Sequence, residues 1–166
     1  PSRPAYAMVG DGAMQMNGIN ELITIAKYWQ EWDDPRLVVA VLRNEDLNLV
    51  TWELRAMGGS PQFLPSQQLP NFGYAAYAES LGLHGLVVSE PDDVAGAWDE
   101  AMAARRPCVI EFQTDPAVPP IPPGATWDQL IKTVESIVRG DSDRLNVIKE
   151  SVKSKLQEAL PGGRDR

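Results

Sequence analysis

The sequence predicts an α/β fold, a parallel sheet with helices on both faces. Short apolar runs alternate along the chain with stretches of helical periodicity. Residues 37–42 form an apolar run without polar alternation, as expected for a strand that is covered on both faces of a parallel sheet. Strands that alternate with helices are joined by right-handed crossovers, so the sheet should be parallel.

Four strands and five helices follow from these patterns. We expect the strands at residues 5–9, 37–42, 85–88 and 108–112, the first of them buried. Apolar residues spaced as on a helix face predict helices at residues 19–26, 74–81, 91–102, 127–138 and 145–159. Gly82 is a stop signal for the second helix, and Val94, Trp98 and Met102 should lie on the inner face of the third.

Residues 45–70 show no clear period and contain several glycines and prolines. We expect them to be irregular. A connection of this length without secondary structure is typical of a functional loop. The tail at residues 161–166 is polar, and we expect it to be disordered.

Composition narrows the class of protein. The chain has 166 residues, enough for one domain with a real core. Its net charge of −8 argues against a nucleic-acid partner. A single cysteine, Cys108, allows no internal disulfide and indicates a reducing, cytoplasmic compartment. No apolar run reaches the length of an integral membrane segment, and no signal peptide is visible.

Two polar side chains follow two of the predicted strands. Asp11, within Gly10-Asp11-Gly12, comes after the first strand, and Asn44 comes after the second. In parallel α/β sheets ligands bind at the carboxyl ends of the strands. One carboxylate and one carboxamide oxygen there suit magnesium, which prefers oxygen ligands and takes the rest from phosphate and water.

The glycines beside Asp11 suit a phosphate. Gly12 permits close backbone approach or a positive φ, and the N–H groups of Gly12 and Ala13 can point at an anion. Asp11 alone would repel a phosphate, so a cation between the two is required by the chemistry.

At this point the residues resemble a known family. Gly10-Asp11-Gly12-Ala13 with Asn44 is similar to the cofactor motif of thiamine-diphosphate-dependent enzymes. Residues 41–53 resemble the metal-site segment of the pyruvate oxidase and acetolactate synthase group, and residues 106–120 resemble the last strand of the same domain with its proline-rich exit. The resemblance covers residues 1–125.

The resemblance implies a role for each matching residue. Asp11 and Asn44 would be side-chain ligands of magnesium, and Asp46 would add its backbone carbonyl. The residues it places at the cofactor are Gly10, Asp11, Gly12, Ala13, Asn44, Asp46, Leu47 and Asn48, and residues 47–52 would lie beside the cofactor or substrate. Asn48 stands where this group often has glycine. The spacing from Asp11 to Asn44 is a little longer than is usual in this group, and the extra residues fall at 30–36.

The resemblance also implies a larger enzyme. Residues 1–125 would be the carboxyl-terminal thiamine-diphosphate-binding domain without its amino-terminal part, followed by a helical extension at 126–160. Because the chain begins with Pro1, we expect a fragment. The glutamate that activates the cofactor lies in another domain in this family, so the piece should be inactive alone. The whole would be a homodimer or homotetramer acting on a 2-oxo acid such as pyruvate, with FAD if it is an oxidase.

Other interpretations stay open. Acetolactate synthase-type carboligation is one alternative, and a non-catalytic module that binds a magnesium–phosphate ligand is another. We expect His84 to be structural or exposed and Cys108 to be an inert core residue. Trp52 either plugs the domain face or lines the pocket.

Overall fold

The computed structural model describes residues 2–118 and 127–149. The chain divides into two compact units, residues 1–45 with 69–114 and residues 46–68 with 115–166. The predicted boundary between residues 125 and 126, the tail at 161–166 and most of the helix at 145–159 lie outside the described residues; residues 144–149 are helical.

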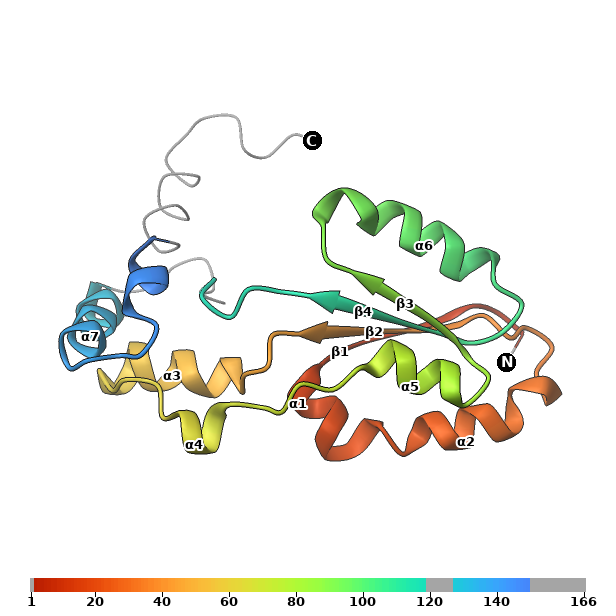
Figure 1. Ribbon diagram of the computed structural model, residues 1–166, viewed down its shortest axis with the longest axis horizontal. Coiled ribbons are helices and arrows are strands. Elements are labelled where there is room, and N and C mark those ends of the chain that lie inside the picture. The colour runs from red at the N-terminus through yellow and green to blue at the C-terminus, as the bar shows by residue number, and fades with distance from the viewer. Residues whose placement is uncertain (1, 119–126, 150–166) are drawn as a thin grey trace. The chain divides into compact units, whose positions relative to one another are not determined.

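The first unit is built on a four-stranded, fully parallel sheet, as predicted. Its strands are β1 (Ala5–Gly10), β2 (Leu37–Arg43), β3 (His84–Val88) and β4 (Cys108–Gln113), in the order β1-β2-β4-β3. Two apolar clusters flank it, one with side chains from α2 (Glu21–Tyr28) and α5 (Tyr74–Ser80), the other with side chains from α6 (Val94–Ala103). Figure 1 shows α6 on one side of the sheet and α2 and α5 on the other, which confirms helices on both faces.

The expected burial of the strands is correct for β2 and wrong for β1. Val38, Val39, Ala40 and Val41 are all buried between the two helical layers. In β1, by contrast, Tyr6 and Met8 are 59% and 67% exposed. The reason is position, because β1 is the edge strand of the sheet in this chain.

The helices of the first unit depart from the prediction chiefly at their starts. A helical segment begins directly after β1 as α1 (Asp11–Ala13), continues through a π-helical turn (Met14–Gly18) and leads into α2. The helix therefore starts well before residue 19. The stop at Gly82 is confirmed, since this glycine has a φ of +79°. A short 3₁₀ turn (Pro91–Asp93) precedes α6, and another (Trp29–Glu31) follows α2.

The second unit corrects the expectation that residues 45–70 are irregular. They contain α3 (Asn48–Gly58) and α4 (Leu64–Gln67), and α7 (Trp127–Val138), which was predicted, packs against α3. Helix α3 ends at Gly58 and is capped by Gly59, which has a φ of +58°; the N–H of the next residue, Ser60, donates to the Leu54 carbonyl.

The inverted amphipathicity of α3 explains the missed helix. Its buried face carries polar and aromatic side chains, whereas most of its apolar side chains are exposed. The buried residues are Thr51, Trp52 and Arg55, and the exposed ones include Leu49, Val50 and Met57. Apolar periodicity therefore gave no sign of the packed face. No helix in the described part of the chain is both long and apolar enough to cross a membrane.

Candidate functional site

The strand ends bring Asp11 and Asn44 to one edge of the sheet, as the sequence predicts. β1 and β2 are parallel neighbours, and Gly10 pairs with Leu42 in their register. Asp11 directly follows Gly10, and Asn44 lies two residues past Leu42. Both residues therefore leave the same carboxyl edge side by side, where α/β sheets bind ligands.

Asp11 is the buried centre of this edge. Its carboxylate oxygen Oδ2 accepts the backbone N–H of Asn44 at 3.0 Å and that of Glu45 at 2.7 Å. Its Oδ1 accepts the N–H of Gly12 at 3.0 Å. The side chain is 3% exposed. Asp11 thus ties the turn after β2 to the start of α1.

Tyr74, which no sequence motif indicated, contacts the backbone of Asp11. The Tyr74 hydroxyl donates to the Asp11 carbonyl at 3.2 Å and accepts from Gln15 Nε2 at 2.9 Å. Burial raises the pKa of Tyr74, and the charges of Asp11 and Glu111 add to the rise. Tyr74 therefore stays a neutral donor that fixes the backbone at the helix start.

The negative charge of the Asp11 carboxylate is compensated by the dipoles of backbone N–H groups. Among the described residues no lysine or arginine forms an ion pair with it; its partners are three backbone N–H groups. A buried carboxylate without a cation is costly, so the residues present fit a bound divalent cation. The described residues contain no group of three His, Cys, Asp or Glu side chains that would hold a metal. A metal here would instead be bound by one carboxylate, one carboxamide and oxygens of the backbone, of phosphate or of water.

Gly10, which precedes Asp11, leaves open space at this edge of the sheet. A Cβ placed on Gly10 would meet no atom within 4 Å. Gly12 lies in α1 with helical geometry, so of its two predicted uses the positive φ does not apply. Its N–H is engaged by Asp11, whereas Ala13 is exposed. Helix starts carry N–H groups without intrahelical partners, which is the general basis for binding an anion here.

The predicted residues Asp46, Leu47 and Asn48 belong to the second unit. The Asp46 carboxylate is 5% exposed and accepts from Thr51 Oγ1 and Gln62 Nε2, each at 2.9 Å. Its side chain thereby fastens the first turn of α3, a role that sequence reasoning did not foresee. The Leu47 N–H donates to a backbone carbonyl, that of Gln67, at 2.8 Å.

Two α3 side chains meet at one carbonyl. Asn48 Nδ2 and Trp52 Nε1 both donate to the Pro116 carbonyl, at 2.8 and 3.1 Å. Trp52 is 4% exposed, which favours the interpretation that it plugs the domain over the interpretation that it lines a pocket.

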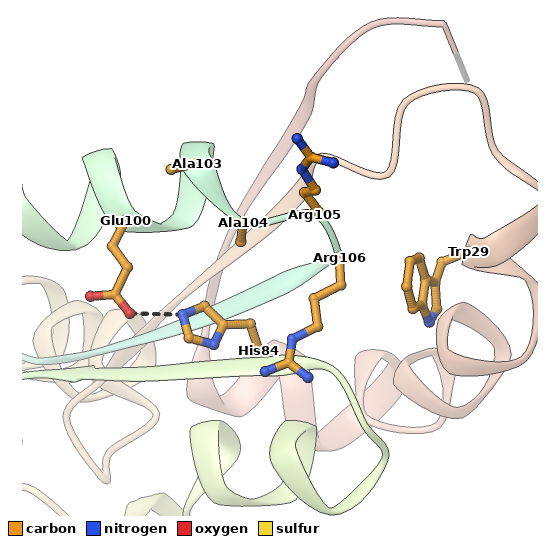
Figure 2. Close-up of a pocket in the computed structure, with 7 residues that line it drawn as sticks. All are labelled: Trp29, His84, Glu100, Ala103, Ala104, Arg105 and Arg106. Carbon is orange, nitrogen blue, oxygen red and sulfur yellow. Dashed lines mark hydrogen bonds and ion pairs between the residues drawn. The ribbon is translucent and has the colours of Figure 1, made fainter.

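A separate pocket of about 430 Å³ lies at the opposite, amino-terminal end of the strands. Figure 2 shows its lining: Trp29, His84, Glu100, Ala103, Ala104, Arg105 and Arg106. His84 Nε2 contacts Glu100 Oε1 at 2.9 Å, in agreement with a structural role for His84. None of the predicted site residues lines this pocket.

Cys108 opens β4 in the core, as expected. It is 1% exposed, and burial raises the pKa of its thiol to about 12. A thiol that remains protonated at neutral pH is a poor nucleophile.

Comparisons with known proteins establish the family. Residues 1–112 match the model of the thiamine pyrophosphate enzyme, C-terminal TPP binding domain. The chain belongs to this family. Thiamine pyrophosphate is another name for thiamine diphosphate. A candidate thiamine pyrophosphate-containing protein of Bacillus subtilis, YdaP, is 32% identical over 129 residues, which is 78% of this chain and 21% of YdaP.

Further relatives lie among acetolactate synthases and decarboxylases. A probable acetolactate synthase large subunit of Methanocaldococcus jannaschii is 26% identical over 81% of this chain and 22% of its own. The 4-hydroxybenzoylformate decarboxylase of Rhodococcus jostii is 25% identical with a TM-score of 0.58, over 69% of this chain and 20% of its own. Benzoylformate decarboxylase of Polynucleobacter necessarius has the same TM-score and coverages at 20% identity, which shows the shared fold. The chain thus spans about a fifth of the length of these relatives.

Proposed function

We propose that this chain anchors magnesium and the diphosphate of thiamine diphosphate in an enzyme that decarboxylates a 2-oxo acid. The observation that carries the proposal is the buried Asp11 carboxylate, which is held beside Asn44 at the carboxyl edge of β1 and β2 and compensated by N–H dipoles alone among the described residues. Asp11 and Asn44 would supply side-chain oxygens to magnesium.

The remaining members of the proposed site come from the sequence resemblance. The backbone carbonyl of Asp46 would be the third protein ligand; since Asp46 belongs to the second unit, it enters on the resemblance alone. Gly10, Gly12 and Ala13 would face the diphosphate. Leu47 and Asn48 would lie beside the cofactor or substrate.

The chain's own task would be binding and orientation. Thiamine diphosphate, when bound, supplies the nucleophilic carbon and electron sink for loss of carbon dioxide from a 2-oxo acid. The protein edge described above would hold the charged end of that cofactor and exclude water from it. The glutamate that activates the ring lies in another domain in this family, so we propose that the chain is inactive alone.

The first candidate for the whole enzyme is a pyruvate oxidase-like flavoprotein that uses FAD. A second candidate is an acetolactate synthase, which the names of several relatives favour. The two differ in what happens after carbon dioxide has left pyruvate. Bound flavin with oxidation of the two-carbon unit would support the oxidase, and acetolactate as the product would support the carboligase. For either we propose a homodimer or homotetramer.

Calorimetric titration of the full-length protein with thiamine diphosphate tests the proposal. We expect binding that requires magnesium and that falls by a factor of ten or more in Asp11→Ala and Asn44→Ala. Unchanged binding in both variants would refute the metal site. Magnesium-dependent binding without release of carbon dioxide from any 2-oxo acid would favour the non-catalytic module.

A further inference from the structure

We infer that Arg43 and Glu111 form a positioning pair for the candidate magnesium site, because they fix the turn that carries Asn44. The inference rests on the proposed function, since the ion presented to that turn is the proposed magnesium. Neither side chain needs to touch the metal or the cofactor. Both act through the backbone on either side of Asn44.

Glu111 is the first part of the pair. It lies in the middle of β4, is 2% exposed and stands in a strand that is otherwise almost wholly apolar. Its Oε1 accepts from Arg43 Nη1 at 2.5 Å, and its Oε2 accepts the N–H of Ala75 at 3.1 Å, in the first turn of α5. A carboxylate is expensive to bury, so its presence in a strand core points to a purpose beyond stability.

Arg43 connects Glu111 to the carboxyl edge of the sheet. It is the last residue of β2 and directly precedes Asn44. While Nη1 holds Glu111, Nη2 donates to Glu45 Oε1 at 2.9 Å. The Arg43 carbonyl also accepts the N–H of Thr114 at 2.8 Å. The guanidinium therefore joins the buried interior of the sheet to the residue on the far side of Asn44.

Glu45 shows why the turn needs such support. It is the single non-glycine residue with a positive φ, +58°, in the described part of the chain. A left-handed residue with a side chain persists where its surroundings over-determine it. Here its N–H donates to Asp11, its carbonyl accepts the Leu69 N–H at 2.8 Å, and its carboxylate holds Arg43. Asn44 lies between two anchored residues and is thereby pre-set for a ligand.

The test measures the magnesium concentration at half-saturation of thiamine diphosphate binding in the full-length protein. We compare the wild type with Arg43→Met, Glu111→Gln and the double variant. Supporting groups behind metal ligands change metal affinity by about 10–100-fold, so we expect each single variant to need about tenfold more magnesium. At saturating magnesium the cofactor affinity should stay within about twofold, and the double variant should be no worse than either single one.

Two matched variants keep the test specific. Arg36 and Asp34 form an ion pair at 2.6 Å before the opposite, amino-terminal end of β2, and Arg36→Gln removes it without approaching Asn44. It should leave magnesium half-saturation unchanged. Arg43→Lys keeps a cation but has one nitrogen in place of the two that contact Glu111 and Glu45, so it should recover only part of the affinity lost in Arg43→Met. Circular dichroism at the titration temperature identifies the variants that are folded.

The outcomes separate this inference from the proposed function. If Asp11→Ala abolishes magnesium-dependent binding while folded Arg43→Met and Glu111→Gln match the wild type, the pair merely stabilises the fold and the inference is wrong. An equal shift in Arg36→Gln would also overturn it, since any loss of charge would then suffice. If the wild type binds the cofactor without magnesium, the proposed function fails and this inference fails with it.

Discussion

The carboxylate of Asp11 accepts the backbone N–H of Asn44 at 3.0 Å, so the first candidate metal ligand holds the second in place. The two residues are 33 positions apart and meet because β1 and β2 are parallel neighbours. One oxygen of Asp11 is thereby committed to the turn. Asp11 therefore combines a structural role with a proposed metal-binding role, and the side chain of Asn44 is proposed as the second metal ligand.

The strained turn makes a prediction at Glu45. A β-branched residue resists a φ of +58°, so Glu45→Val should lower the free energy of unfolding by about 1–2 kcal/mol. Glu45→Gly removes the strain, which is stabilising, and also removes a partly exposed ion pair, which is destabilising. Its free energy of unfolding should therefore stay within about 0.5 kcal/mol of the wild-type value. Urea unfolding of both variants measures the difference. Equal losses in the two would show that the backbone conformation at Glu45 carries no strain.

The contact between α5 and β3 depends on the absence of a side chain at Gly85. A Cβ there would lie 2.3 Å from the Ala75 carbonyl oxygen and 2.8 Å from its carbon. Since backbone must move to make room, Gly85→Ala should cost about 2 kcal/mol or more. Gly96 in α6 is the control: a Cβ there meets nothing within 4 Å, and alanine should stabilise the helix by roughly 0.5–1 kcal/mol. Thermal unfolding in which both variants shift the same way would contradict the packing.

In the second unit a buried ion pair joins α3 to the residues after α7. Arg55 Nε and Nη2 donate to the Asp141 carboxylate at 2.9 and 2.8 Å, and both side chains are almost fully buried. Arg55→Met leaves that carboxylate uncompensated and should cost about 3 kcal/mol. The exposed pair of Arg139 and Glu135, 3.9 Å apart, is the control, and Glu135→Gln, which leaves the hydrogen bond from Arg139 to the Gly59 carbonyl in place, should cost less than about 0.5 kcal/mol. Hydrogen exchange of the α7 amides reports both.

The same pair predicts a dependence on pH. Burial by itself would raise the pKa of Asp141, but the hydrogen bonds from Arg55 and the Gln62 N–H outweigh it and lower the pKa below the ordinary 3.8. The stabilisation is therefore present above pH 4 and is lost as the pH falls through the depressed pKa of the folded state. Exchange protection of α7 should fall below pH 4 in the wild type. Protection that falls instead above pH 5 would contradict the sign of the shift.

Cys108 should be inert until the first unit unfolds. Its buried thiol has a pKa of about 12, so at pH 8 it should react with an aromatic disulfide reagent more than about 100-fold more slowly than in the denatured chain. Stability should decline between about pH 9 and 12, because only the unfolded chain ionises its thiol there. A fast reaction in the native protein would place Cys108 at an accessible surface.

The fold was largely predictable from the sequence because apolar runs report burial directly. The position of β2 and the carboxyl ends of β1 and β2 follow from such runs. Because these two ends lie side by side, the proximity of Asp11 and Asn44 follows as well. The exposure of Tyr6 did not follow, since it depends on which strands lie beside β1. The helix α3 was missed because it buries Arg55 and other polar or aromatic groups.

The supporting parts of the site were harder to predict. Tyr74 and Asp11 are far apart in sequence, and no local pattern joins them. Glu111 did leave a signal, an acid inside an otherwise apolar strand, but only the register of β2 and β4 identifies its partner as Arg43. Polar pairs between distant elements depend on tertiary packing, on which single-residue propensities carry no information.

The metal site at Asp11 and Asn44 is tested most directly by a crystal structure of the full-length protein grown with thiamine diphosphate and manganese in place of magnesium. Anomalous scattering locates manganese without reference to the protein chain. We expect one peak in contact with the side-chain oxygens of Asp11 and Asn44, at about 2.1 Å from each, with the diphosphate on its far side. A bound cofactor with its manganese peak away from both residues would contradict this expectation.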